Sequence, residues 1–388
     1  MKKHTPKGSF RGATLEKLRK IGLTVLGEWT MRPPVRTGGR SINLRSDTVT
    51  QPTAEMRNAM LWVAVGDDEY GEDPTVIRLQ DLAAEITGKE AALFVPSGLM
   101  GNQIAIMTHT KRQGVIILNQ NSHIETLERF AYATLSNVGS RPIYSKDNTV
   151  SGVDVRASIN KASLYYPETT LLCLENALIN GTVVPLNVMK SAFETAKEFN
   201  IPVHLDGARL FNAATHLGVD VKDITQYTDS VMFCLSKGLC APIGSMLCGS
   251  KEFIEKARHN RKMLGGGMRQ AGVLAICGII GLEQMTGRLK DDHDNAKYMA
   301  TSLEQIFGSY IEIEPAKVHI NMVFFKITKA GFDHESFVEH LHEHGIIING
   351  RNLDSNQYRF MTHNDVRKED VDYVLDVITR YVSKRDAA

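Results

Sequence analysis

Three short polar stretches in this sequence each follow an apolar run, and their side chains could act together. Asp206 and Arg209 follow "IPVHL", Ser236 and Lys237 follow "VMFCL", and the turn at residues 96–98 follows "ALFV". Burying a free ammonium group is costly, so a lone lysine at the end of a buried run suggests a chemical use. Backbone N–H groups at a helix start bind anions, and glycine lets the chain approach a phosphate closely.

A carboxylate, an amine and a phosphate-binding turn together suit pyridoxal phosphate. Lys237 would form the imine, Asp206 would keep the ring nitrogen protonated, and Ser97 and Gly98 would hold the phosphate. Each signal also has a simpler interpretation. An Asp-Gly pair is often a turn, a lone lysine often extends its amine to solvent, and S-G-x-x-G is common. The spacing alone leaves both interpretations open.

The elements that would position these residues alternate from about residue 90 onward. β-rich runs are separated by helical stretches such as "NVMKSAFETAKEFN", which is typical of βαβ units and a mainly parallel sheet. Ligands of such sheets bind beyond the carboxyl ends of the strands. From about residue 290 a long helix leads into mixed strand and helix pieces. We therefore predict an α/β large domain over 41–290 and a smaller α+β domain over 291–388.

Residues 1–40 differ from the rest of the chain. They hold ten Lys or Arg against two Glu, and "PPVRTGG" marks a joint before "INLRSDTVT". Within them, "ATLEKLRKIGLTVLGEW" could form a helix with one apolar face and a basic face opposite. This basic extension could be a targeting or membrane-surface segment, or an arm that packs on a partner subunit. The arm is the simpler interpretation.

Composition limits the class of protein. The chain has 388 residues, 43% hydrophobic residues and a net charge of +1, which is typical of a globular protein and gives no reason to expect a nucleic-acid partner. No apolar run approaches the roughly 20 residues needed to cross a bilayer. The five cysteines form no C-x-x-C pair and lie mostly in apolar runs. They indicate buried thiols, a reducing, cytoplasmic compartment and no structural zinc.

Six segments together resemble the L-threonine aldolases, in the aromatic amino acid β-eliminating lyase and threonine aldolase family of pyridoxal-phosphate enzymes. These are "INLRSDTVTQPT", "VGDDEYGEDPT", "EAALFVPSGLMGNQ", "VHLDGARLFNA", "CLSKGLCAPIGS" and "RKMLGGGMRQAG". They recur in family order from about residue 42 to 285, so the resemblance covers a whole domain. It implies the transferase-like fold type I and pyridoxal 5'-phosphate as cofactor.

The resemblance also implies residue roles. Lys237 matches the Schiff-base lysine, Asp206 the partner of the ring nitrogen, and Arg209 the arginine near the ring hydroxyl and substrate carboxylate. His123 matches the histidine that stacks on the ring, and it, or a water that it holds, is the candidate base. The expected cofactor-binding residues are Ser97, Gly98, Leu99, His123, Asp206, Arg209, Lys237, Lys262 and Arg269. The expected substrate-binding residues are Ser46, Tyr70, Arg209 and Arg359.

Part of this expected site belongs to a neighbouring subunit. Lys262 and Arg269 match residues that reach the cofactor phosphate of a neighbour, and Tyr70 likewise borders the neighbour's site. A site built across an interface implies an obligate homo-oligomer, either a dimer or a tetramer.

The chain departs from the family pattern where the β-substituent is recognised. The family motif Glu-Asn-Thr-His-Asn supplies a histidine that contacts the substrate hydroxyl, whereas this chain has Ala177, Leu178 and Ile179 after Glu-Asn. Leu99 replaces a usual threonine in the phosphate turn. In the segment after "SHI", only the glutamate, Glu128, is kept. The cofactor half of the site therefore matches the family better than the half that reads the side chain.

Two other clusters could bind a metal. The acidic run "GDDEYGED" offers hard oxygen ligands, but Asp73 before Pro74 favours a loop that caps the next helix. In "EHLHEHG", a helix would place His340 and His344 on one face and His342 elsewhere. A solvated helix face is the favoured interpretation, and no metal is predicted.

The expected activity is retro-aldol cleavage of a β-hydroxy-α-amino acid, such as threonine or allo-threonine, to glycine and an aldehyde. A related β-eliminating lyase or an amino-acid racemase that uses Lys237 as the Cα base is the alternative. A non-catalytic regulatory protein that retains the fold is disfavoured by the full set Lys237, Asp206 and Arg209.

Overall fold

The computed structural model describes residues 41–353 and 355–386. The basic extension, for which an arm or a targeting segment was predicted, lies outside these residues. Within them, no helix is both long enough and apolar enough to cross a membrane.

The large sheet has seven strands in the order β2-β8-β7-β6-β5-β3-β4. β8 runs antiparallel to both of its neighbours, and the other strands are parallel to one another. The strands are β2 (Ala91–Val95), β3 (Val115–Asn119), β4 (Gly139–Ile143), β5 (Thr169–Glu175), β6 (Val203–Asp206), β7 (Ser230–Cys234) and β8 (Ser245–Gly249). The predicted mainly parallel α/β sheet is confirmed.

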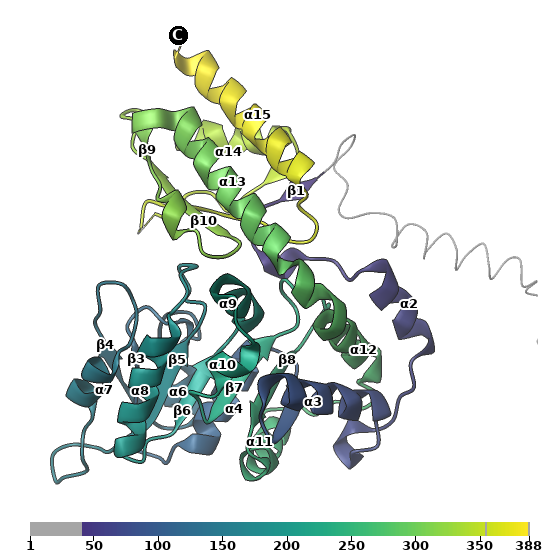
Figure 1. Ribbon diagram of the computed structural model, residues 1–388, viewed down its shortest axis with the longest axis vertical. Helices are drawn as coiled ribbons and strands as arrows, with labels where there is room; N and C mark the ends of the chain where they lie inside the picture. Colours follow the sequence, from purple (N-terminus) through teal and green to yellow (C-terminus); the bar gives the residue numbers. More distant parts are fainter. Residues whose placement is uncertain (1–40, 354, 387–388) are drawn as a thin grey trace, which may run out of the picture. The chain divides into compact units, whose positions relative to one another are not determined.

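Helices cover both faces of this sheet, because successive side chains along its buried strands point to opposite sides. In β7, Phe233 faces one core and Met232 faces another. The first face carries α3 (Pro74–Thr87), α7 (Gly152–Ser158), α8 (Leu186–Glu198), α9 (Leu210–Leu217), α10 (Val221–Thr225) and α12 (Gly272–Ile280), as Figure 1 shows. The second carries α4 (Gly98–His109), α5 (His123–Thr126), α6 (Ala131–Leu135) and α11 (Lys251–Met263).

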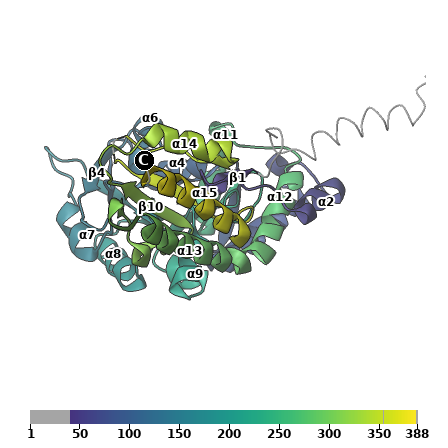
Figure 2. The same ribbon diagram turned by 90° about the horizontal axis from the view of Figure 1, so that it is seen from above.

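A second apolar core lies toward the C-terminus. An antiparallel sheet of order β12-β10-β9 packs there against helices, and Figure 2 shows α13 and α15 side by side next to β10. The strands are β9 (Ile311–Glu312), β10 (Met322–Ile327) and β12 (Tyr358–Met361). The helices are α13 (Leu289–Phe307), α14 (His334–Glu343) and α15 (Lys368–Asp386). The domain limits at 41–290 and 291–388 stay a prediction.

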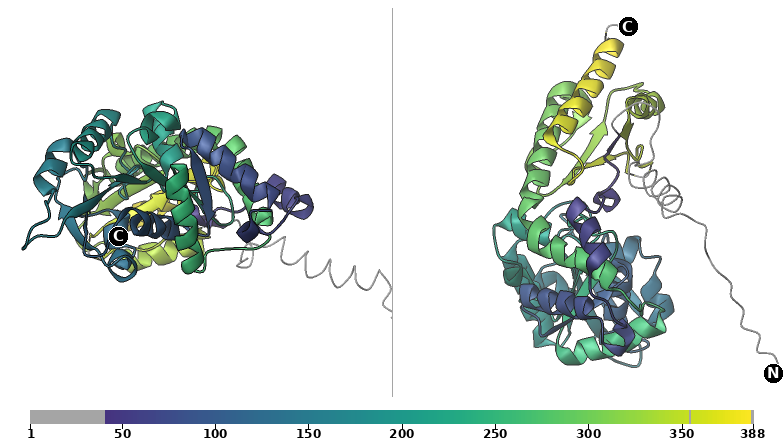
Figure 3. Two further views of the ribbon diagram at one scale, coloured as in Figure 1. Left: turned by 90° about the horizontal axis from the view of Figure 1, so that it is seen from below. Right: turned by 90° about the vertical axis from the view of Figure 1, so that its right-hand side faces the viewer.

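Two segments connect the cores. α13 buries Leu289 in the first core and its later turns in the second, so this one helix spans both (Figure 3). β1 (Ile42–Asn43) pairs in parallel with β11 (Ile346–Ile347), and Ile42 and Leu44 pack in the C-terminal core. The chain then enters a short 3-10 helix, η1 (Asp47–Val49), and α2 (Ala54–Trp62), which packs on α12.

Local signals in the sequence explain several element ends. The Asp73 carboxylate accepts hydrogen bonds from the N–H groups of Thr75 and Val76, and Pro74 opens α3, so the predicted cap is confirmed. The preceding acidic residues form the turn η2 (Asp68–Tyr70), which was the favoured interpretation of the acidic run. All five cysteines are buried free thiols, as expected.

Candidate functional site

The carboxyl ends of the parallel strands meet along one edge of the large sheet. Glu175 ends β5 and lies in register with Asp206, which ends β6, and Asp206 lies in register with Met232 of β7. Lys237 follows β7 by three residues, and Ser97 follows β2 by two. The sheet therefore brings the strand-end residues singled out in the sequence to a single edge, where α/β sheets bind ligands.

The turn after β2 is built as an anion site. The Ser97 hydroxyl caps α4 by accepting from the N–H of Met100 at 3.2 Å, and Gly101 N–H donates to the Ser97 carbonyl. Among the described residues, the N–H groups of Gly98 and Leu99 have no acceptor, and these groups fit a phosphate. Packing gives a second reason for glycine at position 98. A Cβ there would lie 2.9 Å from Cys234 Sγ, so helix–sheet packing excludes a side chain.

Asp206 is a buried carboxylate with two donors fixed on it. Asn102 Nδ2 donates to Oδ2 at 2.8 Å, and the Ala208 N–H donates to Oδ1 at 3.0 Å. Each carboxylate oxygen of Asp206 therefore accepts one hydrogen bond. This donor set fits the partner of a protonated pyridine nitrogen.

Asn102 is held in turn by a buried chain of hydrogen bonds. Asn102 Nδ2 donates to Asp206 and to Glu128, so its Oδ1 must accept from His204 Nε2 at 3.1 Å. Burial lowers the pKa of His204 to about 3, so the ring is neutral and its Nδ1 accepts from Ser230 Oγ at 2.9 Å. Ser230 Oγ then accepts from His109 Nε2 at 2.8 Å. Each donor in this chain is directed toward the two carboxylates.

His123 is oriented from two sides. Its Nδ1 lies 2.9 Å from Glu128 Oε1, and this hydrogen bond raises the pKa of His123 despite the opposing effect of burial. Its backbone N–H donates to Glu175 Oε2 at 2.7 Å. Burial, followed by repulsion from Asp206, raises the pKa of Glu175 to about 8. The Nδ1 proton of His123 therefore points to Glu128, which leaves Nε2 as the acceptor of the ring.

Arg209 and Asp47 form a buried bidentate ion pair that the sequence did not reveal. Arg209 donates from Nε and Nη2 to Asp47 at 2.8 and 2.7 Å, and Asn321 Nδ2 donates to the same carboxylate at 3.2 Å. Burial alone would raise the pKa of Asp47, but Arg209 outweighs it and holds the pKa well below its usual range. Only Nη1 of Arg209 then remains outside this pair.

Arg359 and Ser46 lie beside this pair. Arg359 donates from Nη2 to the carbonyl of Arg45 at 3.0 Å. Burial and then the charge of Arg209 lower the pKa of Arg359, so a second guanidinium lies within electrostatic range of the first and of Asp47. Ser46 Oγ accepts from the N–H and the hydroxyl of Thr48, which leaves its own proton free to donate. This excess of positive charge suits an anionic ligand such as an amino-acid carboxylate.

Lys237 lies next to this positive region. The residue is half-buried, and Thr50 Oγ1 donates to its carbonyl at 2.9 Å. Its charge contributes to lowering the pKa of Asp47 and opposes protonation of His123, so its amine lies within electrostatic range of both. The strand-end geometry thus brings Lys237, Asp206, Arg209 and His123 together.

The three residues expected to serve a neighbouring subunit gather elsewhere. Lys262 pairs with Glu69, and Arg269 Nη1 lies 3.0 Å from Asp67 Oδ2. Tyr70 belongs to the same turn and is 76% exposed. The two cations are therefore held by carboxylates of their own chain, on a surface that also exposes the tyrosine.

Sequence reasoning missed several residues that shape this site. They are Asp47, Asn102, Glu175, His204, Ser230 and Asn321. Asp47, Asn102 and His204 lie inside the segments "LRSDT", "GLMGNQ" and "VHLDGAR", so their proximity to matched residues was the available signal. Ser230 and Asn321 carry no such local signal, because only tertiary contacts place them here.

Acid is expected to destabilise the fold through the buried hydrogen bonds that link His109, Ser230, His204 and Asn102. Burial lowers the pKa of His204 to about 3 and of His109 to about 4, whereas an unfolded histidine titrates near 6.5. The unfolded chain therefore binds protons that the native chain does not, and stability falls as the pH drops below about 6.5. Two such histidines make the free energy of unfolding change by about 2.7 kcal/mol per pH unit.

Urea unfolding at pH 5 to 8 measures this slope. His109→Phe keeps the ring stacked on Phe253, at 4.4 Å, and removes one titrating group, so it should lower the slope by about half of that contribution. Both rings are neutral at pH 8, so unfolding at this pH measures any packing defect of the variant separately from the loss of the titrating group. Equal slopes for the variant and the parent protein would contradict the assignment.

Comparisons with known proteins agree with this geometry. Residues 43–328 match the family model of β-eliminating lyases. The chain is 42% identical to low-specificity L-threonine aldolase 1 of Arabidopsis thaliana over 343 residues, which cover 87% of this chain and 95% of that one. It is 40% identical to the low-specificity L-threonine aldolase of Escherichia coli K12 over 329 residues, with 84% and 95% covered.

The solved structure of a Leishmania major threonine aldolase has the same fold. The two superpose with a TM-score of 0.74 at 19% identity and cover 88% of this chain and 99% of that one. The predicted fold type I and the predicted family are both confirmed. The chain therefore belongs to the β-eliminating lyase family, in its threonine aldolase branch.

Proposed function

We propose that this protein is a pyridoxal-phosphate-dependent aldehyde-lyase that cleaves a β-hydroxy-α-amino acid, such as threonine or allo-threonine, to glycine and an aldehyde. The observation that carries the proposal is the joint placement of Lys237 and the hydrogen-bonded Asp206 beside two guanidinium groups, those of Arg209 and Arg359. The curated relatives, which are named low-specificity L-threonine aldolases, support the same reaction.

Each residue of the site has a distinct part in this reaction. When bound at Lys237, pyridoxal phosphate supplies the electron sink for cleavage at Cα. The N–H groups of Gly98 and Leu99 hold its phosphate, and Asp206 keeps its ring nitrogen protonated. Arg359 and the Ser46 hydroxyl bind the substrate carboxylate. His123 Nε2, or a water bound to it, accepts the proton of the β-hydroxyl.

Glu128 and Glu175 support His123 in that part. The Glu128 carboxylate fixes the Nδ1 proton, so the lone pair of Nε2 stays available. Glu175 holds the backbone of His123 at the sheet edge. A histidine whose pKa lies above its usual value is a stronger base for the hydroxyl proton.

One observation favours a different substrate or a different reaction. Leu178 replaces the family histidine, is 5% exposed, and lines a small cavity together with Ser122 and Glu175. A lost hydrogen bond to the substrate hydroxyl costs about 1–3 kcal/mol, or roughly ten- to a hundredfold in rate. Threonine would then be cleaved slowly, and β-elimination or racemisation of another amino acid becomes the second candidate.

A product screen distinguishes these reactions. Both enantiomers of threonine, allo-threonine and bulkier β-hydroxy amino acids are incubated with the holoenzyme. Glycine plus aldehyde, keto acid plus ammonia, and racemised amino acid are scored separately. We expect glycine and aldehyde, with a bulkier apolar substrate preferred over threonine. Fast cleavage of threonine would reject the altered preference, and keto acid without glycine would reject the aldolase itself.

The proposed assembly is a homo-oligomer, a dimer or a tetramer, with shared active sites. Lys262, Arg269 and Tyr70 gather on one exposed surface, which supports their proposed contact with a neighbour's cofactor phosphate. The proposed compartment is the cytoplasm, in keeping with five free buried thiols. The proposed partners are the amino-acid substrate and further copies of this chain, without nucleic acid.

Subunit mixing tests the shared site. Lys237→Ala subunits and Arg269→Ala subunits are each expected to be inactive alone. Mixed under conditions of subunit exchange, they should regain part of the activity, because a hybrid assembles one site that carries neither change. Activity of the mixture, together with mass measurement of the hybrid, reports the result. Proven hybrids without recovery would place Arg269 outside the neighbour's site.

A further inference from the structure

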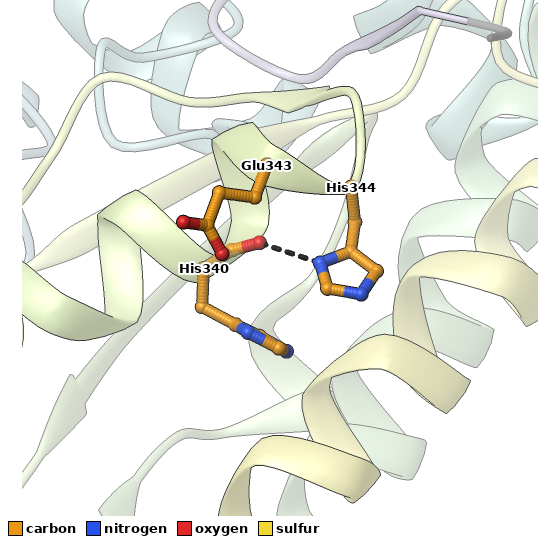
Figure 4. A group of neighbouring side chains, drawn as sticks. All are labelled: His340, Glu343 and His344. Carbon is orange, nitrogen blue, oxygen red and sulfur yellow. Dashed lines mark hydrogen bonds between the residues drawn. The ribbon is translucent and has the colours of Figure 1, made fainter. Parts of the chain in front are cut away.

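A group of metal-ligating side chains lies at the end of α14, in the C-terminal core region. His340, Glu343 and His344 each offer one donor atom, and these atoms lie within 4.8 Å of one another. Figure 4 shows the two imidazoles and the carboxylate turned toward a common space. The spacing explains this arrangement, because residues i, i+3 and i+4 share one face of a helix. The expectation of a solvated face considered the histidines and left out Glu343.

The tautomer of the neutral His344 ring is set by its neighbour. His344 Nδ1 lies 2.8 Å from the carbonyl oxygen of His340, as the dashed line in Figure 4 marks. A carbonyl only accepts, so Nδ1 must carry the proton and Nε2 must carry the lone pair. Histidines that bind metals donate their other N–H to a carbonyl or carboxylate in the same way, which sets the tautomer and orients the ring.

The two imidazoles already lie close together at a partly open surface. Their ring centroids are 4.3 Å apart, and the rings are tilted by 49°. Both histidines are half-buried and Glu343 is exposed, so solvent reaches the group. Ligand atoms of a tetrahedral zinc ion are about 3.3 Å apart, given bonds of about 2.0–2.1 Å. Rotation of the exposed Glu343 and small shifts of the two half-buried rings would bring the ligand atoms to this spacing.

We propose that His340, Glu343 and His344 form a binding site for a divalent transition-metal ion, with Zn²⁺ as the expected ion. Two imidazoles and one carboxylate suit zinc, and water completes the coordination. The same ligands disfavour Mg²⁺ and Ca²⁺, which prefer oxygen atoms only. The site is separate from the sheet edge that holds Lys237, and the proposal does not depend on the proposed reaction.

The position of the site gives metal binding a structural consequence. His344 is the last residue before Gly345, whose carbonyl accepts from the N–H of Ile42 at 2.9 Å, and β11 follows directly. Tyr373 on α15 donates to the carbonyl of His344 at 3.2 Å. An ion at this point would fix the junction of α14 and β11, to which β1 and α15 are attached. Binding to the native state alone raises the thermal midpoint.

The experiment titrates the holoenzyme with ZnCl₂ after treatment with a chelator. The holoenzyme is chosen because His123, Glu128 and Asp206 form the other such donor group among the described residues, and bound cofactor covers it. Isothermal titration should show one zinc ion per chain, with no binding of MgCl₂. The thermal midpoint should rise with zinc and fall again with excess EDTA.

Three variants locate the ion. His344→Ala and His340→Ala should each weaken zinc binding at least about tenfold and remove the rise in thermal midpoint. His342→Ala is the matched control, because His342 lies on the same helix but outside the group. This variant should bind zinc like the parent protein. Turnover of the β-hydroxy amino acid without zinc should be the same in all four proteins.

Several outcomes would overturn the proposal. These are no zinc binding by the parent protein at about 100 µM free ion, unchanged affinity in the His340 and His344 variants, or equal loss in the His342 variant. If a variant fails to fold, chemical modification of the parent protein with and without zinc tests the proposal instead. Zinc should shield His344 of the parent protein from diethylpyrocarbonate but leave the exposed His259 of α11 reactive, as read by peptide mass. Failure of the aldolase proposal would leave these readouts unaffected.

Discussion

Replacing Lys237 by alanine is expected to abolish covalent attachment of the cofactor and to lower turnover by at least about a thousandfold. Among the residues brought to the sheet edge, Lys237 is the one whose amine can bond to the cofactor aldehyde. The measurement is reduction of the holoenzyme with borohydride, followed by peptide mapping of the labelled lysine. The parent protein should carry the label on Lys237, and the variant should carry none and lose the yellow colour.

A matched control and a clear counter-result accompany this experiment. Lys256 lies on the exposed face of α11 and pairs with Glu252, so Lys256→Ala should keep both label and activity. Lys89 is the informative alternative target. Its Nζ donates to the carbonyls of Thr225 and Thr228 at 2.8 and 2.6 Å, which holds the amine away from chemistry. A label on Lys89, or on any lysine other than Lys237, would overturn the assignment.

Replacing Asp47 by asparagine is expected to lower the free energy of unfolding by about 3–5 kcal/mol. Asp47 is fully buried, and the Arg209 side chain opposite it is 13% exposed. Removing one partner leaves the guanidinium charge in the interior without compensation, and burial disfavours that charge. Urea unfolding at pH 7 measures the loss.

A surface pair provides the control for this prediction. Arg156 and Glu198 form an ion pair in which both side chains are about half exposed. Glu198→Gln should change the unfolding free energy by less than about 1 kcal/mol, because solvent screens such pairs. A double change of Asp47→Asn with Arg209→Leu should cost less than the sum of the single changes, since the uncompensated charge is then absent. Additive losses would show that the pair contributes no coupling.

The strands that carry the site were predictable from local patterns. The runs "ALFV", "GVIIL", "TLLCL" and "SVMFCL" correspond to β2, β3, β5 and β7, and short apolar runs between helical stretches indicate parallel strands. Because the carboxyl ends of such strands meet, the sequence also placed Lys237, Asp206 and the phosphate turn together. Periodicity and connection order are sufficient for this much of the site.

Other features depend on pairing over long distances and could not be predicted. β8 lies between β2 and β7 and runs against both, and apolar patterning does not report strand direction. The partner of Arg209 is 162 residues away in the chain, and nothing in the segment around Asp47 shows which cation it pairs with. His204 looked like one more residue of a strand, and its function follows only from the side chains around it.

The pairing of β1 with β11 sets the order in which a growing chain can complete its site. The seven strands of the large sheet end at Gly249, so they can pair while the rest of the chain is still being made, and α12 and Leu289 complete one covering core later. The proposed carboxylate-binding side also uses Asn321 and Arg359, which contact residues 274 and 314 positions earlier in the chain. A ribosome-bound chain can thus hold Lys237 and Asp206 in place and still lack the residues proposed to bind the substrate carboxylate.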